Sequence, residues 1–201
     1  MIHGSGVVRA GQWARRLIIN QDLEKGTMLP YIKFIMEQGW GVAVLNTNHN
    51  EESGETIPEN GSPEEHANTV WEEVVKPCKA ERIAVIAHSY GGVVTMDLAS
   101  RQKEDWLGRV AGVFMTDSVH YRLTGDQEVD TKLELVSKNY VASEEEVGAA
   151  LTSSRRGVAR YSAGHTAHEW TSWAAREKIF QDLQNTFTEE SQQEGSSRTE
   201  L

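Results

Sequence analysis

The segment Ile83–Gly92, IAVIAHSYGG, constrains the fold of this 201-residue chain more than any other. A short apolar run leads into a serine and two glycines, and a helical segment follows. This is the strand, sharp turn and helix of a nucleophile elbow, G-x-S-x-G, with Ala87 in place of the first glycine. Such a turn strains the serine backbone, so the residues two before and two after it must be small, as Ala87 and Gly91 are. Ser89 is the candidate nucleophile; the alternative is a serine that only caps the helix.

The rest of the chain alternates between apolar runs of strand length and segments of helical period. Such alternation is typical of a parallel sheet covered by helices, so we predict an α/β fold. The capping pattern at Ser62-Pro63 starts one covering helix, which ends before Pro77. Another is predicted over Thr27–Gln38, with Gly39 as its C-terminal cap. The predicted core strands are Trp40–Leu45, Arg82–Ala87 and Val110–Met115.

The length and the polarity pattern predict one domain over residues 1–187. Residues 46–61 lack apolar periodicity and are expected to form an exposed loop. Residues 126–151 are expected to form a pair of short helices above the sheet. The polar segment 188–201 is expected to be disordered.

Charge and cysteine content exclude several classes of protein. The chain has 20 Lys and Arg against 30 Asp and Glu, a formal charge of -10, which disfavours direct binding to nucleic acid. The single cysteine, Cys78, leaves no intrachain disulfide and no thiolate zinc site, which suits a reducing compartment. We expect neither a signal peptide nor a membrane span, since no basic stretch precedes a long apolar run.

A serine nucleophile needs a base and an orienting acid. The best acid after Ser89 is Asp117, which directly follows a predicted strand, where catalytic groups gather in open α/β sheets. Asp126 and Asp130 are the alternative acids. The favoured base is His168, at a loop-to-helix junction, with His165 as the second candidate. The order Ser, Asp, His is that of α/β-hydrolases.

The oxyanion of a tetrahedral intermediate needs hydrogen-bond donors near the nucleophile. The backbone N–H of Tyr90, the residue after Ser89, is one candidate donor. The other is expected from the glycine-rich stretch that follows His3, through the N–H of Gly4 or Ser5. Two independent segments thus fit one constellation.

A metal site is the competing interpretation of the histidines. No HExxH or paired-cysteine spacing supports it, so we expect no metal and no cofactor. The ligands of such a site would be Asp117, His120, His165 and His168.

Five blocks of the sequence resemble successive blocks of the Argonaute-binding protein two domain family, which is known in animals as family with sequence similarity 172. They occur in the family's order and extend over most of residues 2 to 187. The blocks are IHGSGVVRAGQWARRLIIN (Ile2–Asn20), NGSPEEHA (Asn60–Ala67), AHSYGG (Ala87–Gly92), TDSVH (Thr116–His120), and SAG with AHEWTSW within Ser162–Trp173.

The resemblance implies an α/β-hydrolase-like three-layer sandwich with a mainly parallel sheet. It places the family's proposed nucleophile, acid and base on Ser89, Asp117 and His168. It also implies a nuclear cotranscriptional or RNA-silencing regulator that binds Argonaute-type proteins and chromatin or splicing partners, in nucleus and cytoplasm. The alternative function is an active serine hydrolase on esters or thioesters.

The chain departs from the family pattern in two places. The insert between Asn46–Asn50 and the NGSPEEHA block is shorter, a change that loops tolerate. The strand that leads into His3 is nearly absent, so we expect a domain that lacks its N-terminal strands and has an unpaired edge beside the elbow strand.

Overall fold

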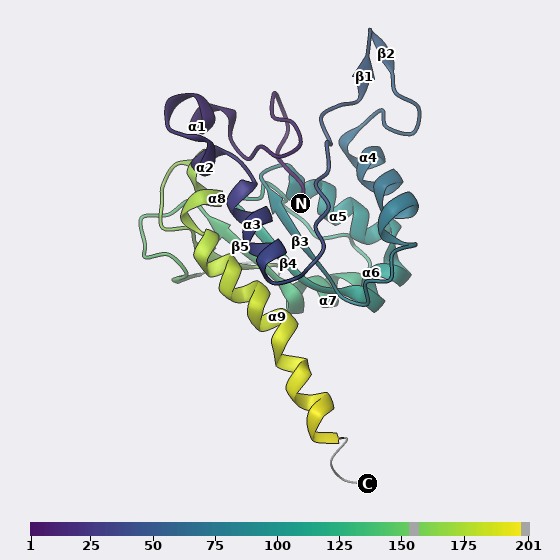
Figure 1. Ribbon diagram of the computed structural model, residues 1–201, viewed down its shortest axis with the longest axis vertical. Helices are drawn as coiled ribbons and strands as arrows, with labels where there is room; N and C mark the ends of the chain where they lie inside the picture. Colours follow the sequence, from purple (N-terminus) through teal and green to yellow (C-terminus); the bar gives the residue numbers. More distant parts are fainter. Residues whose placement is uncertain (153–156, 198–201) are drawn as a thin grey trace.

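A five-stranded sheet lies at the centre of the computed structural model, which describes residues 1–152 and 157–197, with side chains for 1–152 and 157–188 (Figure 1). Strands β3, β4, β5 and β7 are parallel, and β6 joins the outer edge antiparallel to β7. The α/β fold with a mainly parallel sheet is therefore confirmed. In spatial order the strands are β3 (Ile83–His88), β4 (Val110–Thr116), β5 (Ser137–Val141), β7 (Ala159–Ser162) and β6 (Ala150–Leu151).

Helices cover both faces of this sheet, giving three layers. One face packs against α4 (Pro63–Val70), the single π-helical turn η1 (Trp71–Val75), α5 (Gly91–Arg101), α6 (Lys103–Arg109) and α7 (Gln127–Val136). The other packs against α3 (Leu29–Glu37) and α9 (Arg176–Ser197), which cross in front of the sheet in Figure 1. The shorter helices are α1 (Arg15–Asn20), α2 (Leu23–Gly26), η2 (His168–Trp170) and α8 (Thr171–Ala174).

Strands β3 and β4 carry apolar runs because each buries side chains on both faces. In β3, Val85 packs with the α5 side and its neighbour Ile86 with the α3 and α9 side. In β4, Met115 packs on the α5 side and Phe114 on the α3 and α9 side. Two apolar clusters, one on each face, therefore form the core.

The predicted helix ends are confirmed by their caps. Ser62 accepts a hydrogen bond from the backbone N–H of Glu65 at 3.1 Å, and the Glu65 carboxylate accepts one from the N–H of Gly61 at 2.9 Å. At the end of α3, Gly39 has a φ of +76° and the Trp40 N–H donates to the Ile35 carbonyl at 3.2 Å. This is a glycine-terminated Schellman cap.

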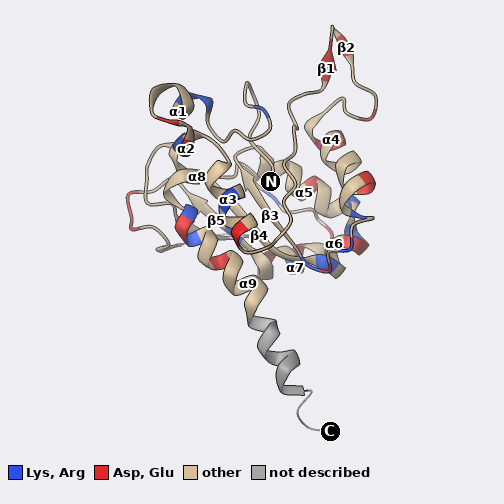
Figure 2. Cartoon of the chain, viewed as in Figure 1, with Lys and Arg blue, Asp and Glu red and all other residues tan. Residues whose placement is uncertain are grey.

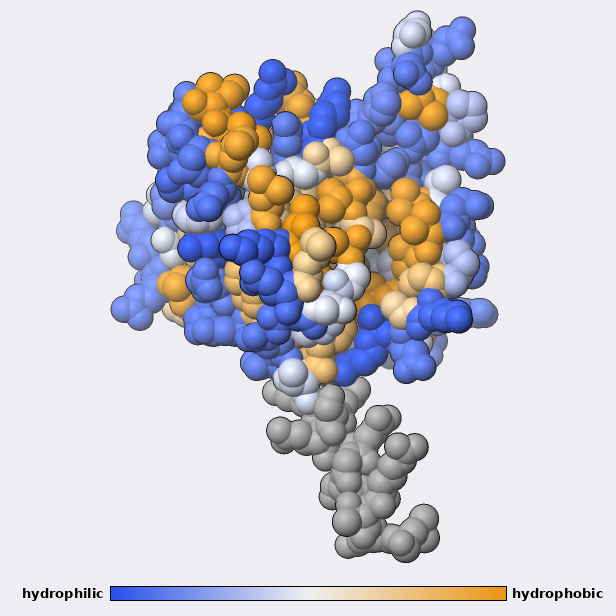
Figure 3. All heavy atoms as spheres, in the orientation of Figure 1, coloured by the Kyte–Doolittle hydropathy of each residue, from blue (hydrophilic) through white to orange (hydrophobic). Residues whose placement is uncertain are grey.

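The strand predicted over Trp40–Leu45 is wrong, because these residues make isolated backbone contacts with the N-terminal segment and form no ladder. Ile2 makes a single parallel bridge to Ala87 of β3, and Met1 lies beyond it. The Met1 amino group donates to the Ala43 carbonyl at 2.6 Å, and Leu45 N–H donates to the Met1 carbonyl at 3.1 Å. Residues 40–45 thus run along this edge without a ladder. Figure 3 shows apolar side chains gathered on this side of the molecule, where Val42 is exposed.

The pair of helices predicted over residues 126–151 is also wrong. Helix α7 ends at Val136, and the chain continues directly into strand β5. Ser137 and Asn139 of β5 are buried polar residues, so the strand lacks the apolar run that marks the others. Asn139 Oδ1 accepts a hydrogen bond from the Ser118 N–H at 3.1 Å, which offsets the burial of that side chain.

The loop expected over residues 46–61 is only partly an exposed connection. It carries a two-stranded hairpin of exposed residues, β1 (Glu51–Glu52) and β2 (Glu55–Thr56). Before the hairpin, however, Thr47 is fully buried and Asn48 contacts the glycine-rich N-terminal stretch. The first part of the loop is therefore packed against the site described below.

Helix α9 continues to Ser197, and residues 198–201 lie outside the described residues. Most of the segment 188–201 has no described side chains, so its predicted disorder stays a prediction. Within the described chain, no helix combines the length and apolar character that a membrane span needs.

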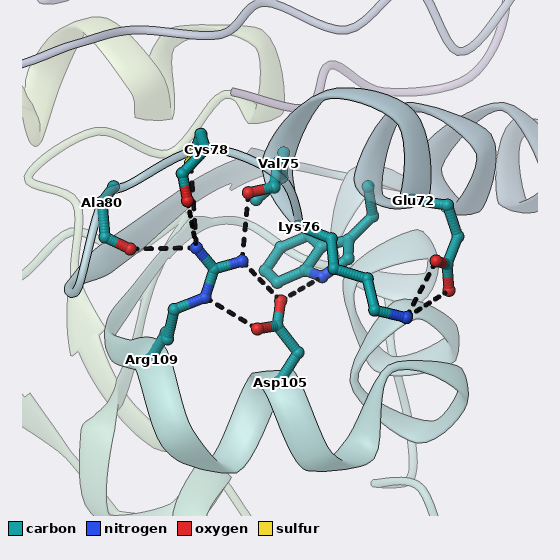
Figure 4. A network of polar contacts seen from close by, with 8 residues as sticks. Glu72, Val75, Lys76, Cys78, Ala80, Asp105 and Arg109 are labelled. Atoms are coloured by element: carbon teal, nitrogen blue, oxygen red, sulfur yellow. Dashed lines mark hydrogen bonds and ion pairs between the residues drawn. The ribbon is translucent and has the colours of Figure 1, made fainter.

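Arg109 anchors the connection that leads into the elbow strand β3. Its guanidinium makes two 2.7 Å bonds to Asp105 and donates to the carbonyl oxygens of Val75, Cys78 and Ala80, as Figure 4 shows. The side chains of both partners are mostly buried, 16% and 20% exposed. A planar fork of donors is needed to reach so many acceptors at once.

We therefore expect Arg109→Lys to lower the free energy of unfolding by about 1 to 3 kcal/mol, since an ammonium leaves several of these acceptors unpaired. Urea denaturation followed by circular dichroism measures this. The matched control is Arg101→Lys, because Arg101 pairs with Asp97 at the same helical spacing with its side chain 56% exposed. The control should change stability by no more than about 0.5 kcal/mol. Equal losses in both variants would contradict the anchoring role.

Candidate active site

Ser89 occupies the sharp turn that the sequence predicts between β3 and α5. Strand β3 ends at His88, Ser89 has a φ of +54°, and α5 begins at Gly91. The Ser89 N–H donates to the carbonyl of Thr116 in the neighbouring strand at 3.0 Å, which fixes this left-handed conformation. The half-buried serine thus sits at the carboxyl edge of the sheet.

The need for small residues around the turn comes from the N-terminal backbone crossing it. A Cβ on Gly91 would lie 2.6 Å from the carbonyl oxygen of Ile2 and 2.8 Å from that of His3. A Cβ on Gly4 would lie 3.1 Å from Cβ of Ser89. Ala87 is fully buried and pairs with Ile2. The N-terminal segment is therefore packed directly on the elbow.

Asp117 and His168 meet although they are far apart in the sequence. Nδ1 of His168 lies 2.7 Å from Oδ2 of Asp117. The other carboxylate oxygen accepts a 3.2 Å bond from the N–H of Ala142. Asp117 follows β4 at a φ of +44°, and its own N–H donates to the backbone carbonyl of Tyr140 in β5 at 2.7 Å. The two ends of neighbouring strands thus hold the carboxylate against the imidazole.

This pair shifts both pKa values toward the charged forms. Burial raises the pKa of Asp117, but the hydrogen bonds from His168 and Ala142 outweigh it and hold the pKa below its ordinary value. The hydrogen bond to Asp117 raises the pKa of His168 above its ordinary value, against a smaller opposing effect of burial. The arrangement therefore stabilises an imidazolium, which a general base must become when it accepts a proton.

Ser89 and His168 line the same hollow, of about 330 Å³, together with His88, Gly4 and Ser5. Among the described residues no hydrogen bond joins the Ser89 hydroxyl to His168, so the acid–base half of the predicted triad is formed and the nucleophile–base contact is not. Such contacts commonly tighten only when substrate binds. A larger hollow of about 510 Å³ lies elsewhere, against Glu134, Lys138 and Asp182, and contains none of the predicted site residues.

The predicted oxyanion donors lie beside Ser89. Tyr90 precedes the first residue of α5, and its hydroxyl donates to the Glu64 carboxylate at 2.8 Å, which fixes its side chain. Gly4 and Ser5 form part of the wall of the hollow. The Gly4 carbonyl accepts bonds from His3 Nδ1 at 2.8 Å and from Asn48 Nδ2 at 2.9 Å, so two partners hold this peptide in place.

Asn48 and His88 are site residues that sequence reasoning missed. Asn48 also donates to the Val8 carbonyl at 3.0 Å, so one amide holds both ends of the glycine-rich stretch. The His88 ring lies 4.7 Å from the His168 ring, centroid to centroid, and forms a surface behind it. Burial, with a smaller effect from His168, lowers the pKa of His88 to about 4, so it is neutral at physiological pH. Two sequence signals could have indicated them: Asn48 lies in the polar segment Asn46–Asn50 (NTNHN), and His88 directly precedes the candidate serine.

The alternative acids and base are placed elsewhere. His165 stacks on Trp170 at 5.0 Å, and its Nδ1 accepts from the Ala167 N–H at 3.0 Å. Asp126 caps α7 and pairs with Lys103. Asp130 accepts bonds from the backbone of 124–125. His168 therefore pairs with Asp117, and not with Asp126 or Asp130.

A second serine–histidine pair lies near the first. The Ser118 hydroxyl is 2.6 Å from His120 Nδ1, and burial lowers the pKa of His120. Among the described residues, no carboxylate contacts His120, so this pair lacks the third member of a triad. No group of three or more His, Cys, Asp or Glu side chains suited to a metal ion occurs within the described ranges.

The positive-φ serine between β3 and α5, and the contact of Asp117 at the end of β4 with His168 of η2, define an α/β-hydrolase-like domain. The chain belongs to the Arb2 domain family, whose sequence pattern matches residues 1–53 and 49–147.

Relatives in animals match most of this chain. Mouse cotranscriptional regulator ARB2A is 35% identical over 253 residues, covering 98% of this chain and 60% of the mouse protein. A FAM172 family protein homolog of Caenorhabditis elegans is 39% identical over 196 residues, covering 94% of this chain and 60% of that protein. The chain thus spans less than two thirds of the length of either relative.

One solved structure shares the fold. The histone deacetylase Clr3 superposes with a TM-score of 0.53 and 17% sequence identity, covering 90% of this chain and 31% of that chain. At this identity the likeness shows the fold alone.

Proposed function

We propose that this protein is a cotranscriptional regulator that acts by binding other proteins through its α/β-hydrolase-like domain. The observation that carries the proposal is the 35% identity to cotranscriptional regulator ARB2A of mouse over 98% of this chain. The partners we propose are Argonaute-type proteins and chromatin or splicing proteins, met in the nucleus and in the cytoplasm. The family resemblance of the five sequence blocks supports this choice.

The charge of the chain supports a protein partner over nucleic acid. A formal charge of -10 complements a basic protein surface and repels a phosphate backbone. Acidic ribbon segments gather on the β1–β2 hairpin and on α4 in Figure 2. These exposed segments are the part of the surface best suited to a basic partner.

We expect the immobilised chain to capture a purified Argonaute-type protein, with capture weakening as salt is added because exposed charges are screened. Ser89→Ala should capture it equally well, since Ser89 lines the hollow and lies outside the acidic segments. Capture is measured by pull-down at low and physiological salt. No capture by either protein, or capture lost in Ser89→Ala alone, would contradict a scaffold role.

A second function, ester or thioester hydrolysis, is favoured by the 2.7 Å contact between Asp117 and His168 at the hollow that holds Ser89. In this mechanism the Ser89 oxygen attacks the acyl carbon, and its proton passes to Nε2 of His168. Asp117 holds the Nδ1 proton and stabilises the imidazolium. The N–H groups of Tyr90 and of Gly4 or Ser5 stabilise the oxyanion.

The second half of the reaction uses the same groups. His168 returns its proton to the leaving alcohol or thiol as the bond to the acyl carbon breaks, leaving an acyl group on Ser89. Water then attacks this ester, giving its proton to His168, and the acid is released as the Ser89 hydroxyl is restored. The first step needs a hydrogen bond between the Ser89 hydroxyl and His168, and we propose that substrate binding completes this contact.

A fluorophosphonate probe tests this function, because it forms a covalent bond only with an activated serine. We expect the wild-type protein to be labelled and Ser89→Ala to remain unlabelled, as resolved by mass spectrometry of the intact protein.

Ser118→Ala is the matched control, since Ser118 also contacts a histidine nearby. It should be labelled like the wild type. An unlabelled, folded wild-type protein would count against catalysis, and labelling that is lost in Ser118→Ala but kept in Ser89→Ala would place the reactive serine at the other pair.

A further inference from the structure

The lining of the hollow has a net positive formal charge, with Arg15 and Arg16 against Glu169, although the chain as a whole is acidic. Residues 1–21 contain Arg9, Arg15 and Arg16 and neither Asp nor Glu, in a protein whose formal charge is -10. Figure 2 shows the basic segments at the start of α1 and in the loop before it, above the carboxyl edge of the sheet. Folding therefore gathers the basic N-terminal segment at the candidate site.

The same segment supplies the apolar part of the hollow. Val7, Val8 and Trp13 line the hollow together with Arg15 and Arg16. The bulk of Trp13 is buried, so its ring forms a fixed wall. The lining of the hollow thus combines apolar surface suited to an acyl chain, two guanidinium groups and the candidate nucleophile Ser89.

The two arginines differ in what they already contact. Arg16 makes a 3.2 Å ion pair with Glu169, which neutralises much of its charge. Arg15 is exposed and makes no ion pair with any described residue, so its charge is available to a ligand. The surplus positive charge in the lining of the hollow therefore comes from Arg15.

From this arrangement we propose that the hollow selects an acyl ester or thioester whose acyl chain carries an anionic group, such as a carboxylate. Its methylene chain packs on Trp13 and the two valines, and Arg15 pairs with the anion. This substrate class rests on the hydrolase function proposed above for the same site. A guanidinium recognises a carboxylate through charge-assisted hydrogen bonds, which a neutral acyl chain cannot form.

Binding is tested apart from turnover in Ser89→Ala, which leaves esters intact. Isothermal calorimetry compares the monomethyl esters of succinate, adipate and suberate, each with one carboxylate, with the corresponding neutral dimethyl esters. We expect the best half-ester to bind about tenfold more tightly than its diester, from one charge-assisted hydrogen-bonded pair. Added salt should reduce the difference.

Adding Arg15→Gln to Ser89→Ala should abolish this preference. The matched control adds Lys79→Gln, which removes one exposed positive charge next to the amino end of β3, at the opposite edge of the sheet from Ser89. The control should keep the preference. Equal affinity for half-esters and diesters, or a preference unaffected by Arg15→Gln, would overturn the proposal.

Turnover by the wild-type protein separates this inference from the hydrolase function. Faster hydrolysis of the half-ester supports both. Charge-selective binding without hydrolysis keeps the anionic ligand class and removes the enzyme. Hydrolysis of both esters at equal rates keeps the enzyme and removes the selectivity.

Discussion

The contact between the backbone of Ile2–Gly4 and the turn at Ser89 is the constraint on which the site depends. Gly91 has no room for a side chain because the Ile2 and His3 carbonyls lie over it, and Ala87 pairs with Ile2. This contact requires a glycine at position 91 and brings the first part of the chain to the carboxyl edge of the sheet. The candidate oxyanion donors and the basic, apolar rim of the hollow all follow from it.

The end of the neighbouring strand β4 positions the other members of the site through backbone and side-chain contacts. The Thr116 carbonyl accepts the Ser89 N–H, and the next residue, Asp117, turns its carboxylate to His168. His88, kept neutral by burial, lies behind the His168 ring without adding a charge that would oppose protonation. A site of this kind serves catalysis and also suits a protein whose pocket only binds a ligand. Hydrolysis and the binding of an anionic ligand therefore use one geometry.

Sequence patterns predicted the features that local chemistry determines. The elbow at Ser89, the caps at Ser62 and Gly39 and the apolar strands β3 and β4 each follow from neighbouring residues. Strand β5 was missed because Ser137 and Asn139 interrupt its apolar pattern and are satisfied only by tertiary contacts. The strand predicted over residues 40–45 does not form, although the segment is apolar, because strand pairing depends on the segment that lies beside it in space and not on local sequence. Asn48 was missed for a similar reason, since its acceptors are backbone carbonyls of a distant segment.

The pKa of His168, followed by NMR titration of its imidazole in the wild type and in Asp117→Asn, tests most directly whether the two side chains meet at this edge. The account predicts a wild-type pKa above 6.5, because the paired carboxylate favours the imidazolium, and a lower one in the variant, where burial remains without the ion pair. His120, whose pKa burial alone lowers, should titrate alike in both proteins. A His168 pKa that is the same in both proteins would contradict the account.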